Sequence, residues 1–356
     1  MGLPLGLGLN VVMDGKAYVV PMAVEEPSVV AAASNAAKTL QAAVGGGFWA
    51  DCCARNVMIG QIQLLDVPDL DAAERALVDA NDALVALGNE YCTSMRQRGG
   101  GVIATFVRRI HPAPVMLQQR PTLAAHLHNS RSGISSTQQQ QVRKPYLVLH
   151  VHVDVCEAMG ANVINTVVEG VSSHVAQLAN GRVGLRILSN LAQERKAKSS
   201  FRIDTSKLAY KGFTGTQLAA RIVEAYQFAN DDPFRAATSN KGVMNGIDAV
   251  ALALGQDWRA IESAAHVYTS LLQGGRYGSM THYWIEREGD GIEFLCGVLE
   301  LPMAVATRGG VLQTNPSYQF LMGLMGTPSA QTLAKVKYKK KGGEIAVTKR
   351  FRVSSW

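Results

Sequence analysis

Cysteine is scarce in this chain of 356 residues, which holds five cysteines and no C-x-x-C pair. An odd, scattered set of thiols argues against a disulfide framework and against a zinc knuckle. Long hydrophobic runs are also absent, since no segment approaches the roughly 18 consecutive apolar residues of a membrane span. The N-terminus lacks the basic start of a secretory signal. We therefore expect a soluble protein of the cytoplasm or another reducing compartment, without a membrane partner.

Excess charge is absent from most of the chain. The net charge is +7, and residues 335–356 alone carry a net +7, from their lysines and arginines against Glu344. The remainder is balanced, so nothing in it indicates a nucleic-acid partner. A basic tail can bind polyanions, but a solvated, poorly ordered terminus is the expected meaning of this one.

The apolar content of 47% and the chain length suit two domains of ~100–200 residues each. Apolar periodicity, with proline and glycine at its limits, predicts helices at residues 28–44, 69–96 and 162–178 and a half-buried strand at 146–155. Residues 129–145 are rich in serine and glutamine without a pattern and are predicted to form a loop.

The most informative stretch is DPFRAATSNKGVMNGID at residues 232–248, which places a lysine, two amides and a guanidinium in apolar, glycine-punctuated sequence. After a short apolar run, GQDWRA at 255–260 allows a carboxylate to return to the same pocket. Lysine, carboxylate and amide together favour stabilisation of an oxyanion. A structural ion pair between lysine and aspartate beside a glycine-rich turn is the alternative that spacing alone leaves open.

A second cluster is His150-Val151-His152-Val153-Asp154, which puts three possible metal ligands on one face of a strand. No adjoining fourth ligand follows. We expect structural or solvent-facing histidines and no metal site, with a zinc site as the alternative.

Five motifs, in this order along the chain, closely resemble 3-hydroxy-3-methylglutaryl-CoA (HMG-CoA) reductase, and the EEPS sequence is similar to that of the class II enzymes. The motifs are EEPSVVAAAS at 25–34, EAMGAN at 157–162, LRILSNL at 185–191, DPFRAATSNKGVMNGIDA at 232–249 and GQDWRA at 255–260. The resemblance covers roughly Leu5 to Ala334, and both ends depart from it.

This resemblance implies an α+β fold with a large substrate-binding domain built around a long central helix. A small nucleotide-binding domain, ferredoxin-like and not a Rossmann domain, is inserted in it, and no G-x-G-x-x-G fingerprint is present. The implied limits are 1–55 and 187–334 for the large domain, 56–186 for the small domain and 335–356 for an atypical basic tail. Residues 111–143 are an insertion relative to the family.

In this family a thioester is reduced to an alcohol by two hydride transfers from a nicotinamide cofactor. Each transfer builds negative charge on a carbonyl oxygen, and Lys241 matches the lysine that stabilises this charge. Asp257 matches the aspartate that orients the lysine. Glu26 matches the catalytic glutamate that protonates the aldehyde oxygen, a role for which we expect a buried carboxyl group. An ordinary capping carboxylate is the alternative for Glu26.

The resemblance also implies the substrate-binding residues. Arg235 matches the arginine that binds the free carboxylate of the hydroxymethylglutaryl group, for which a planar guanidinium is well suited. Ser28, Asn190 and Asn245 match neutral polar groups of the same pocket. Taken singly, each of these three is more often a capping or turn residue.

The turn at 157–162 matches the nucleotide turn of the family, with glutamate in place of the usual aspartate. Its implied cofactor-binding residues are Glu157, Met159, Gly160, Ala161 and Asn162. The physical basis is a helix N-terminus that faces the phosphates of the cofactor.

The cofactor is expected to be NADPH, with NADH or dual use as the alternative. NAD-dependent members place an aspartate on the ribose hydroxyl, and alignment puts Cys92 at that position, with Arg96 and Arg98 following it. Nothing there repels a 2′-phosphate.

The sequence therefore predicts an HMG-CoA reductase that converts HMG-CoA to mevalonate and coenzyme A, or runs in reverse. The resemblance implies a homodimer or higher homo-oligomer, because the family builds its active site between subunits. Two alternatives stay open. One is an impaired remnant or pseudoenzyme that binds a coenzyme A ligand, and the other is a zinc hydrolase using His150, His152 and Asp154.

The two ends generate a prediction, because the chain is expected to be truncated at both ends relative to the family. Members carry a C-terminal flap whose histidine protonates the departing thiolate, whereas the last histidine here is His282. The lysines, arginines and tyrosine of the tail have no ordinary pKa near neutrality. We expect the 1–356 chain to reduce the thioester poorly and mevaldehyde better. Rates of NADPH oxidation with each substrate check this, and equal rates on both would contradict it.

Overall fold

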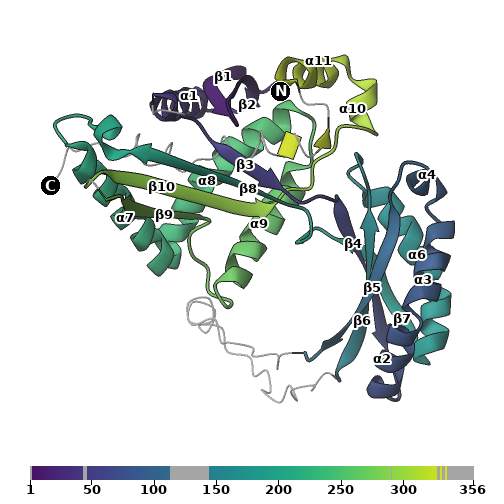
Figure 1. Cartoon of the computed structure of the whole chain (residues 1–356). Coiled ribbons are helices and arrows are strands. Elements are labelled where there is room, and N and C mark those ends of the chain that lie inside the picture. The colour runs from purple at the N-terminus through teal and green to yellow at the C-terminus, as the bar shows by residue number, and fades with distance from the viewer. Residues whose placement is uncertain are drawn as a thin grey trace, which may run out of the picture.

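The computed structural model describes residues 2–42, 46–112, 144–289 and 291–326, together with 329–330 and 333–334. These residues form a larger and a smaller body, side by side (Figure 1). The predicted loop at 129–145 lies outside the described residues except for its last two positions, and the predicted tail at 335–356 lies outside them entirely. Of the predicted insertion, only residues 111 and 112 are described.

The smaller body is an antiparallel sheet covered on one face by helices. Its strands are β4 (Val57–Leu65), β5 (Gly101–Ile110), β6 (Tyr146–Asp154) and β7 (Arg182–Ser189), in the order β5-β6-β4-β7. Its helices are α2 (Leu70–Asp79), α3 (Asn81–Glu90), α4 (Thr93–Arg96) and α6 (Ala161–Ala179). This order along the chain and across the sheet is ferredoxin-like, so the predicted α+β, non-Rossmann fold is confirmed.

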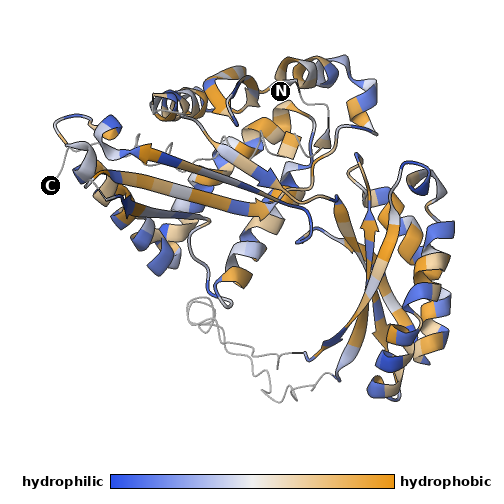
Figure 2. Ribbon diagram, in the orientation of Figure 1, coloured by the Kyte–Doolittle hydropathy of each residue, from blue (hydrophilic) through white to orange (hydrophobic). Residues whose placement is uncertain are grey.

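Alternation along β6 explains why this sheet has one covered face. Leu147, Leu149, Val151 and Val153 are almost fully buried against the helices. The residues between them point to the opposite face, which helices leave open (Figure 1). Figure 2 shows hydrophobic residues along the strands of this sheet and along the helices that cover it.

The helix predicted at 69–96 is divided into α2, α3 and α4, so the prediction of one continuous helix was wrong. Asp69 caps α2 by accepting hydrogen bonds from the backbone N–H groups of Asp71 and Ala72. The break at Ala80 lets the side chain of Asn81 accept hydrogen bonds from the backbone N–H and hydroxyl groups of Thr105 in β5, at 2.9 and 3.1 Å. Apolar periodicity does not report such polar bonds to a distant strand.

The larger body combines a hairpin, a four-stranded antiparallel sheet and helices. The hairpin is β1 (Leu5–Met13) and β2 (Lys16–Ala23), and the sheet is β3 (Trp49–Cys52), β8 (Lys196–Asp204), β10 (Glu293–Pro302) and β9 (Thr281–Arg287), in that spatial order. The helices are α1 (Pro27–Gln41), η1 (Thr205–Leu208), α7 (Gly215–Asp231), α8 (Pro233–Ala253), α9 (Trp258–Leu272), α10 (Val311–Thr314) and α11 (Pro316–Met325).

Helix α8 is the long central helix that was expected. Its inner side carries buried residues such as Met244, Ile247 and Val250, which belong to a core shared with the hairpin, α1, α9, β10 and α11. Within the described ranges, no helix is long and apolar enough to cross a membrane.

The chain enters the smaller body through β4 and leaves it through β7, and these strands are neighbours. Ile59 pairs with Ser189, so the point of entry and the point of exit lie together. Strand β7 runs past the predicted domain limit at 186/187. The division into 1–55, 56–186 and 187–334 stays a prediction.

Packing between β4 and α6 generates a stability prediction. A Cβ atom at Gly60 would lie 2.4 Å from Val168 Cγ1 and 2.9 Å from Ile164 Cγ2, closer than such atoms can approach. We expect Gly60→Ala to lower the free energy of unfolding by roughly 1–3 kcal/mol through overpacking. Denaturant titration measures it.

The matched control is Gly323→Ala in α11, where a Cβ atom would meet nothing within 4 Å. Its effect should be neutral or a gain of up to about 1 kcal/mol, because alanine is the better helix former. Equal losses in the two variants would contradict the packing argument.

Candidate active site

Helix α8 presents three predicted site residues to the same side. Asp232 caps the helix by accepting a hydrogen bond from Phe234 N–H at 3.0 Å, and Pro233 fills the first turn, where proline is tolerated. Arg235, Lys241 and Asn245 then fall within about a third of the helix circumference. Lys241 is exposed, while the other two are half-buried. A cation, an amide and a guanidinium thus share one stripe.

Asn240 fixes the rotation of α8 about its axis. This residue is fully buried, donates from Nδ2 to the carbonyl of Gly278 at 2.8 Å and accepts from Met280 N–H at 2.9 Å. Because Asn240 is held inward on both bonds, the next residue, Lys241, points outward. No local sequence pattern indicates this role, because the two partners lie about 40 residues further along the chain.

Asp257 is engaged at the start of α9. Its carboxylate accepts from Ala260 N–H at 3.2 Å and lies 3.2 Å from the guanidinium of Arg259. Among the described residues no hydrogen bond or ion pair joins it to Lys241. The expected contact between the two is therefore not made in this single chain.

Gln256 anchors the loop that carries Asp257. Its amide donates to the carbonyls of Leu254 at 2.9 Å and Ala306 at 3.0 Å, and its oxygen accepts from Ala306 N–H at 2.8 Å. Ala306 belongs to residues 303–308, which follow β10 and are called the strap below. The loop before α9 is thus fixed to the strap.

Glu26 occupies the capping position of α1. Its backbone is extended, and its carboxylate accepts a hydrogen bond from the hydroxyl of Ser28. Glu26 is exposed in this single chain, so the burial expected for it in a closed pocket stays a prediction. Its position at a helix N-terminus stabilises the anion.

The hydrogen bonds of Asn190 do not involve the predicted site residues of α8. It is exposed at the end of β7, and its carbonyl accepts from Ala192 N–H at 2.9 Å within a turn. In the ranges that the structure describes, no hydrogen bond of its side chain reaches Lys241, Arg235 or Asn245.

The predicted nucleotide turn begins α6 as expected. Gly160 caps the helix with φ +102°, and a Cβ atom there would lie 2.7 Å from the side chain of Val155. Only glycine suits both constraints. The first N–H groups of α6, at Ala161 and Asn162, have no partner within the helix, and the helix dipole makes such a position suited to an anion.

Arg195 is a buried cation that ties this turn to the strap. It is 2% exposed and donates to the carbonyls of Ala158 at 3.1 Å, of Met159 at 3.3 Å and of Val305. Its own carbonyl accepts from Met303 N–H at 2.8 Å. No sequence pattern marked Arg195, because its partners come from two remote segments.

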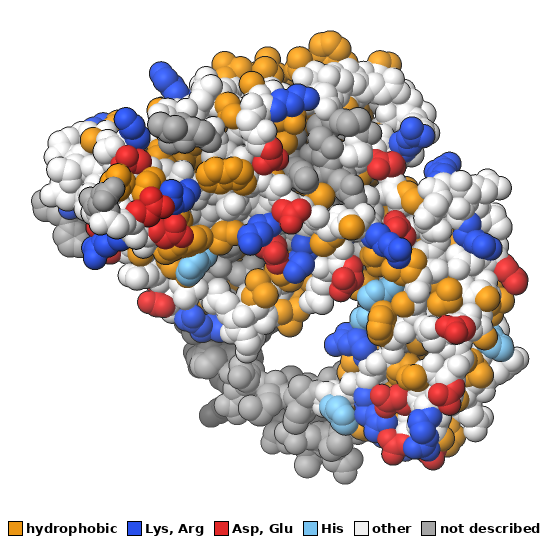
Figure 3. Space-filling view, in the orientation of Figure 1, with side chains coloured by type: hydrophobic (Ala, Val, Ile, Leu, Met, Phe, Trp, Pro, Cys, Tyr) orange, Lys and Arg blue, Asp and Glu red, His pale blue; other side chains and the backbone are white. Residues whose placement is uncertain are grey.

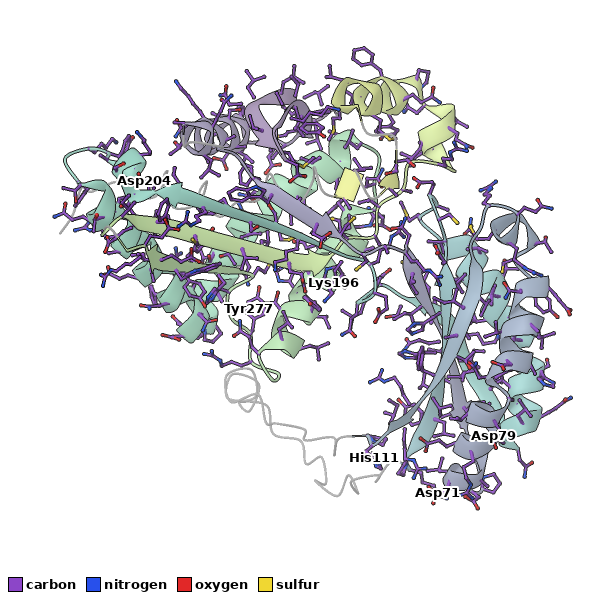
Figure 4. All side chains as sticks on the ribbon, viewed as in Figure 1. Asp71, Asp79, His111, Lys196, Asp204 and Tyr277 are labelled. Carbon is purple, nitrogen blue, oxygen red and sulfur yellow. The ribbon has the colours of Figure 1, made fainter. Side chains whose placement is uncertain are left out.

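Burial lowers the pKa of Arg195 to about 10, and the nearby carboxylates of Asp154 and Glu157 act in the opposite direction. The guanidinium therefore stays charged at neutral pH. Lys196 follows it at the start of β8, where the two bodies meet (Figure 4). That ammonium bonds the carboxylate of Glu300 at 2.9 Å, and this bond raises the pKa of Lys196.

Glu157 completes the connection between the bodies. Its carboxylate accepts from the hydroxyl of Thr307 and from Ala330 N–H at 2.6 Å, and its carbonyl accepts from Thr307 N–H at 3.0 Å. Its predicted role in cofactor binding stays a prediction, but its carboxylate is already occupied by bonds within the chain.

His150, His152 and Asp154 do lie on one face of β6, but each has another environment. His150 Nε2 is 2.9 Å from the amide of Gln61, and burial lowers the pKa of His150 to about 4. The rings of His152 and Phe106 are tilted against each other with their centroids 4.6 Å apart, and Asp154 accepts from Cys156 N–H at 3.0 Å. In the described part of the chain, no three His, Cys, Asp or Glu side chains are placed to hold a metal ion.

Cys92 is 2% exposed and its thiol contacts the carbonyl of Gly88 at 3.5 Å. It packs inside the smaller body, and its alignment with the aspartate position of NAD-dependent members stays a prediction. Arg96 and Arg98 are exposed, and the thiol of Cys156, beside the nucleotide turn, lies 3.5 Å from the carbonyl of Arg98.

Comparison with known proteins agrees with these motifs. The sequence model of the family hydroxymethylglutaryl-coenzyme A reductase matches residues 1–338. The chain is 37% identical over 334 residues to 3-hydroxy-3-methylglutaryl-coenzyme A reductase of Archaeoglobus fulgidus, covering 94% of this chain and 66% of that one. It is 30% identical over 315 residues to the probable enzyme of Borreliella burgdorferi, covering 88% and 63%. The chain therefore spans slightly less than two thirds of these relatives.

Solved structures give the same result. The class II 3-hydroxy-3-methylglutaryl-CoA reductase from Streptococcus pneumoniae, bound to NADPH in open conformations, superimposes with a TM-score of 0.85 at 35% identity, covering all of this chain and 77% of that one. A second structure from that organism gives 0.84 at 35% identity, covering all of this chain and 86% of that one.

The bonds of Arg195 generate a prediction. Arg195→Met would leave three backbone carbonyls without their donor, so we expect the free energy of unfolding to fall by about 3 kcal/mol or more. Denaturant titration measures the change. The matched control is Arg182→Met, which removes an exposed pair with Asp66 and should cost ~1 kcal/mol or less. Similar losses in both variants would refute the role assigned to Arg195.

Proposed function

The chain belongs to the hydroxymethylglutaryl-coenzyme A reductase family, and we propose that it is an NAD(P)H-dependent HMG-CoA reductase, acting toward mevalonate and coenzyme A or in reverse. The observation that carries this proposal is the stripe of Arg235, Lys241 and Asn245 on α8, in a chain that also holds a glycine-capped nucleotide turn. The stripe holds the ammonium, guanidinium and amide groups proposed to bind and polarise a carbonyl substrate. The turn offers backbone N–H groups at a helix N-terminus, which suit an anion.

Lys241 is the proposed stabiliser of the oxyanion. Hydride addition to a carbonyl carbon moves an electron pair onto the oxygen, and an ammonium group directed at that oxygen lowers the barrier. Glu26 would donate a proton to the aldehyde oxygen in the second reduction, and Asp257 would orient Lys241. A reduced nicotinamide supplies the hydride when bound.

The substrate-binding proposal rests on α8 and its neighbours. Arg235 suits the free carboxylate of the substrate because its two terminal nitrogens can bind both oxygens. Asn245 lies one turn after Lys241 on the same stripe, and Ser28 contacts Glu26. Asn190 joins this set by family resemblance.

A homodimer or higher homo-oligomer is proposed because the catalytic groups are open to water in one chain. Glu26 and Lys241 are both exposed, whereas electrostatic catalysis is strongest where water is excluded. Phe234, beside Arg235, is 86% exposed, and Leu185 on the open sheet face is 71% exposed. Figure 3 shows an open space between the two bodies, with hydrophobic, histidine and basic side chains along its described edge. A second copy would cover such surfaces.

NADPH is the proposed cofactor, with NADH as the alternative. Arg96 and Arg98 are exposed, and Arg98 lies beside Cys156, next to the nucleotide turn, where a 2′-phosphate would find positive charge. The Streptococcus pneumoniae relative binds NADPH.

Two substitutions on α8 test the proposal. We expect Lys241→Ala to lower kcat by about 10²–10³-fold with the fold retained, since one oxyanion-stabilising group is lost. Arg235→Lys should instead raise KM for substrate, because a point charge replaces a bidentate group. Steady-state NADPH oxidation with mevaldehyde measures both.

The control is Lys38→Ala, which removes an exposed lysine from the last turn of α1. Its rate should equal that of the parent chain. An unchanged kcat in Lys241→Ala would exclude this lysine from the reaction. Tight thioester binding without turnover of either substrate by the parent chain would favour the alternative of a protein that binds a coenzyme A ligand.

A further inference from the structure

A cavity of about 170 Å³ lies in the larger body, away from the α8 stripe. It is enclosed by the second half of α1, by η1 and the residues after it, by α7 and by the sheet. Its deep part is apolar and is formed by Leu40, Phe201, Ile203, Leu218, Ile222 and Leu295. Protein interiors normally contain few voids larger than a water molecule, so a space of this size is a distinct feature.

Size and lining define what the cavity can hold. An apolar cavity of about 150 Å³ lined by Leu, Ile and Phe stays dry and binds a molecule of the size of benzene. The volume here is similar, and the deep residues are of the same kind. A water molecule is poorly stabilised in such a space, because it needs hydrogen bonds to two or more polar groups. The deep part therefore suits a hydrocarbon group.

The mouth of the cavity is polar and positively charged. Asn35 and Thr39 of α1 lie on one side, and Lys207 lies on the other, with Asn35 and Lys207 exposed. The carboxylate of Asp204, at the far end of β8 (Figure 4), accepts from Ser206 N–H at 2.8 Å. The bonds from Ser206 and the charge of Lys207 lower the pKa of Asp204. In the described part of the chain, Lys207 has no hydrogen bond or salt bridge, so its ammonium group, which lies near one carboxylate, can still bond a ligand at the mouth of the cavity.

We propose that this cavity is a binding site for an amphiphilic monocarboxylate, with an apolar chain of about six to eight carbons inside and its carboxylate at Lys207. The ammonium group of Lys207 favours a ligand with a carboxylate, and the apolar interior favours a ligand with a hydrocarbon chain. The site is separate from the proposed catalytic groups and does not depend on the proposed function. It shares α1 with Glu26, but its residues on that helix begin at Asn35.

Calorimetric titration of the full chain with octanoate tests the site, with octanol as the uncharged comparison. Both should bind. Ala209 is exposed at the mouth, so Ala209→Trp should fold and weaken both ligands at least about tenfold by closing the entrance. Ala42→Trp is the matched control, since Ala42 is exposed at the end of α1 and does not line the cavity. It should bind both ligands like the parent chain.

The charge at the mouth is tested separately. Lys207→Met should weaken octanoate by roughly two- to fivefold, as for an exposed ion pair, and leave octanol unchanged. Lys38→Met, an exposed lysine of α1 outside the cavity, should change neither. Absence of binding by both ligands, or binding that survives Ala209→Trp, would overturn the site. Equal octanoate affinity in Lys207→Met would overturn the carboxylate assignment.

Discussion

The arrangement of the two bodies depends on one buried guanidinium. Arg195 donates to carbonyls of the nucleotide turn and of the strap, and the strap in turn holds Gln256, one residue before Asp257. Removing a charge from water is costly unless its hydrogen-bonding capacity is used. The two terminal nitrogens of Arg195 have their acceptors only while both segments are in place, whereas its Nε has no partner among the described residues. The position of the turn at 157–162 and that of the loop before α9 are therefore fixed together.

The sequence predicted those parts of the fold whose signals are local. The alternation of β6, the proline that begins α1 and the glycine at position 160 that begins α6 each act within a few residues. The break at Ala80 and the burial of Cys92 were missed, because both depend on β5, which is distant in sequence.

The same contrast between local and distant signals applies to the residues of the candidate site. Resemblance assigned Lys241, Arg235 and Asn245, and helical spacing alone puts them on one stripe. The supporting residues Arg195, Asn240 and Gln256 were not assigned, because each is defined by backbone carbonyls and amides of other segments. When a side chain forms hydrogen bonds to backbone groups, its partner can be a residue of almost any type, so the sequence contains no recognisable pair of residues. The exposure of Glu26 likewise could not be read from its neighbours in the chain.

The pairing of Ile59 with Ser189 has a consequence for how the chain is organised. Because the smaller body begins and ends on neighbouring strands, its two connections to the larger body stay close together, whatever the number of residues between them. The entropy of closing such a loop grows only with the logarithm of its length. Residues can therefore be added between β5 and β6 without changing the register of the other sheet. The topology makes the smaller body a unit that evolution can lengthen, shorten or exchange.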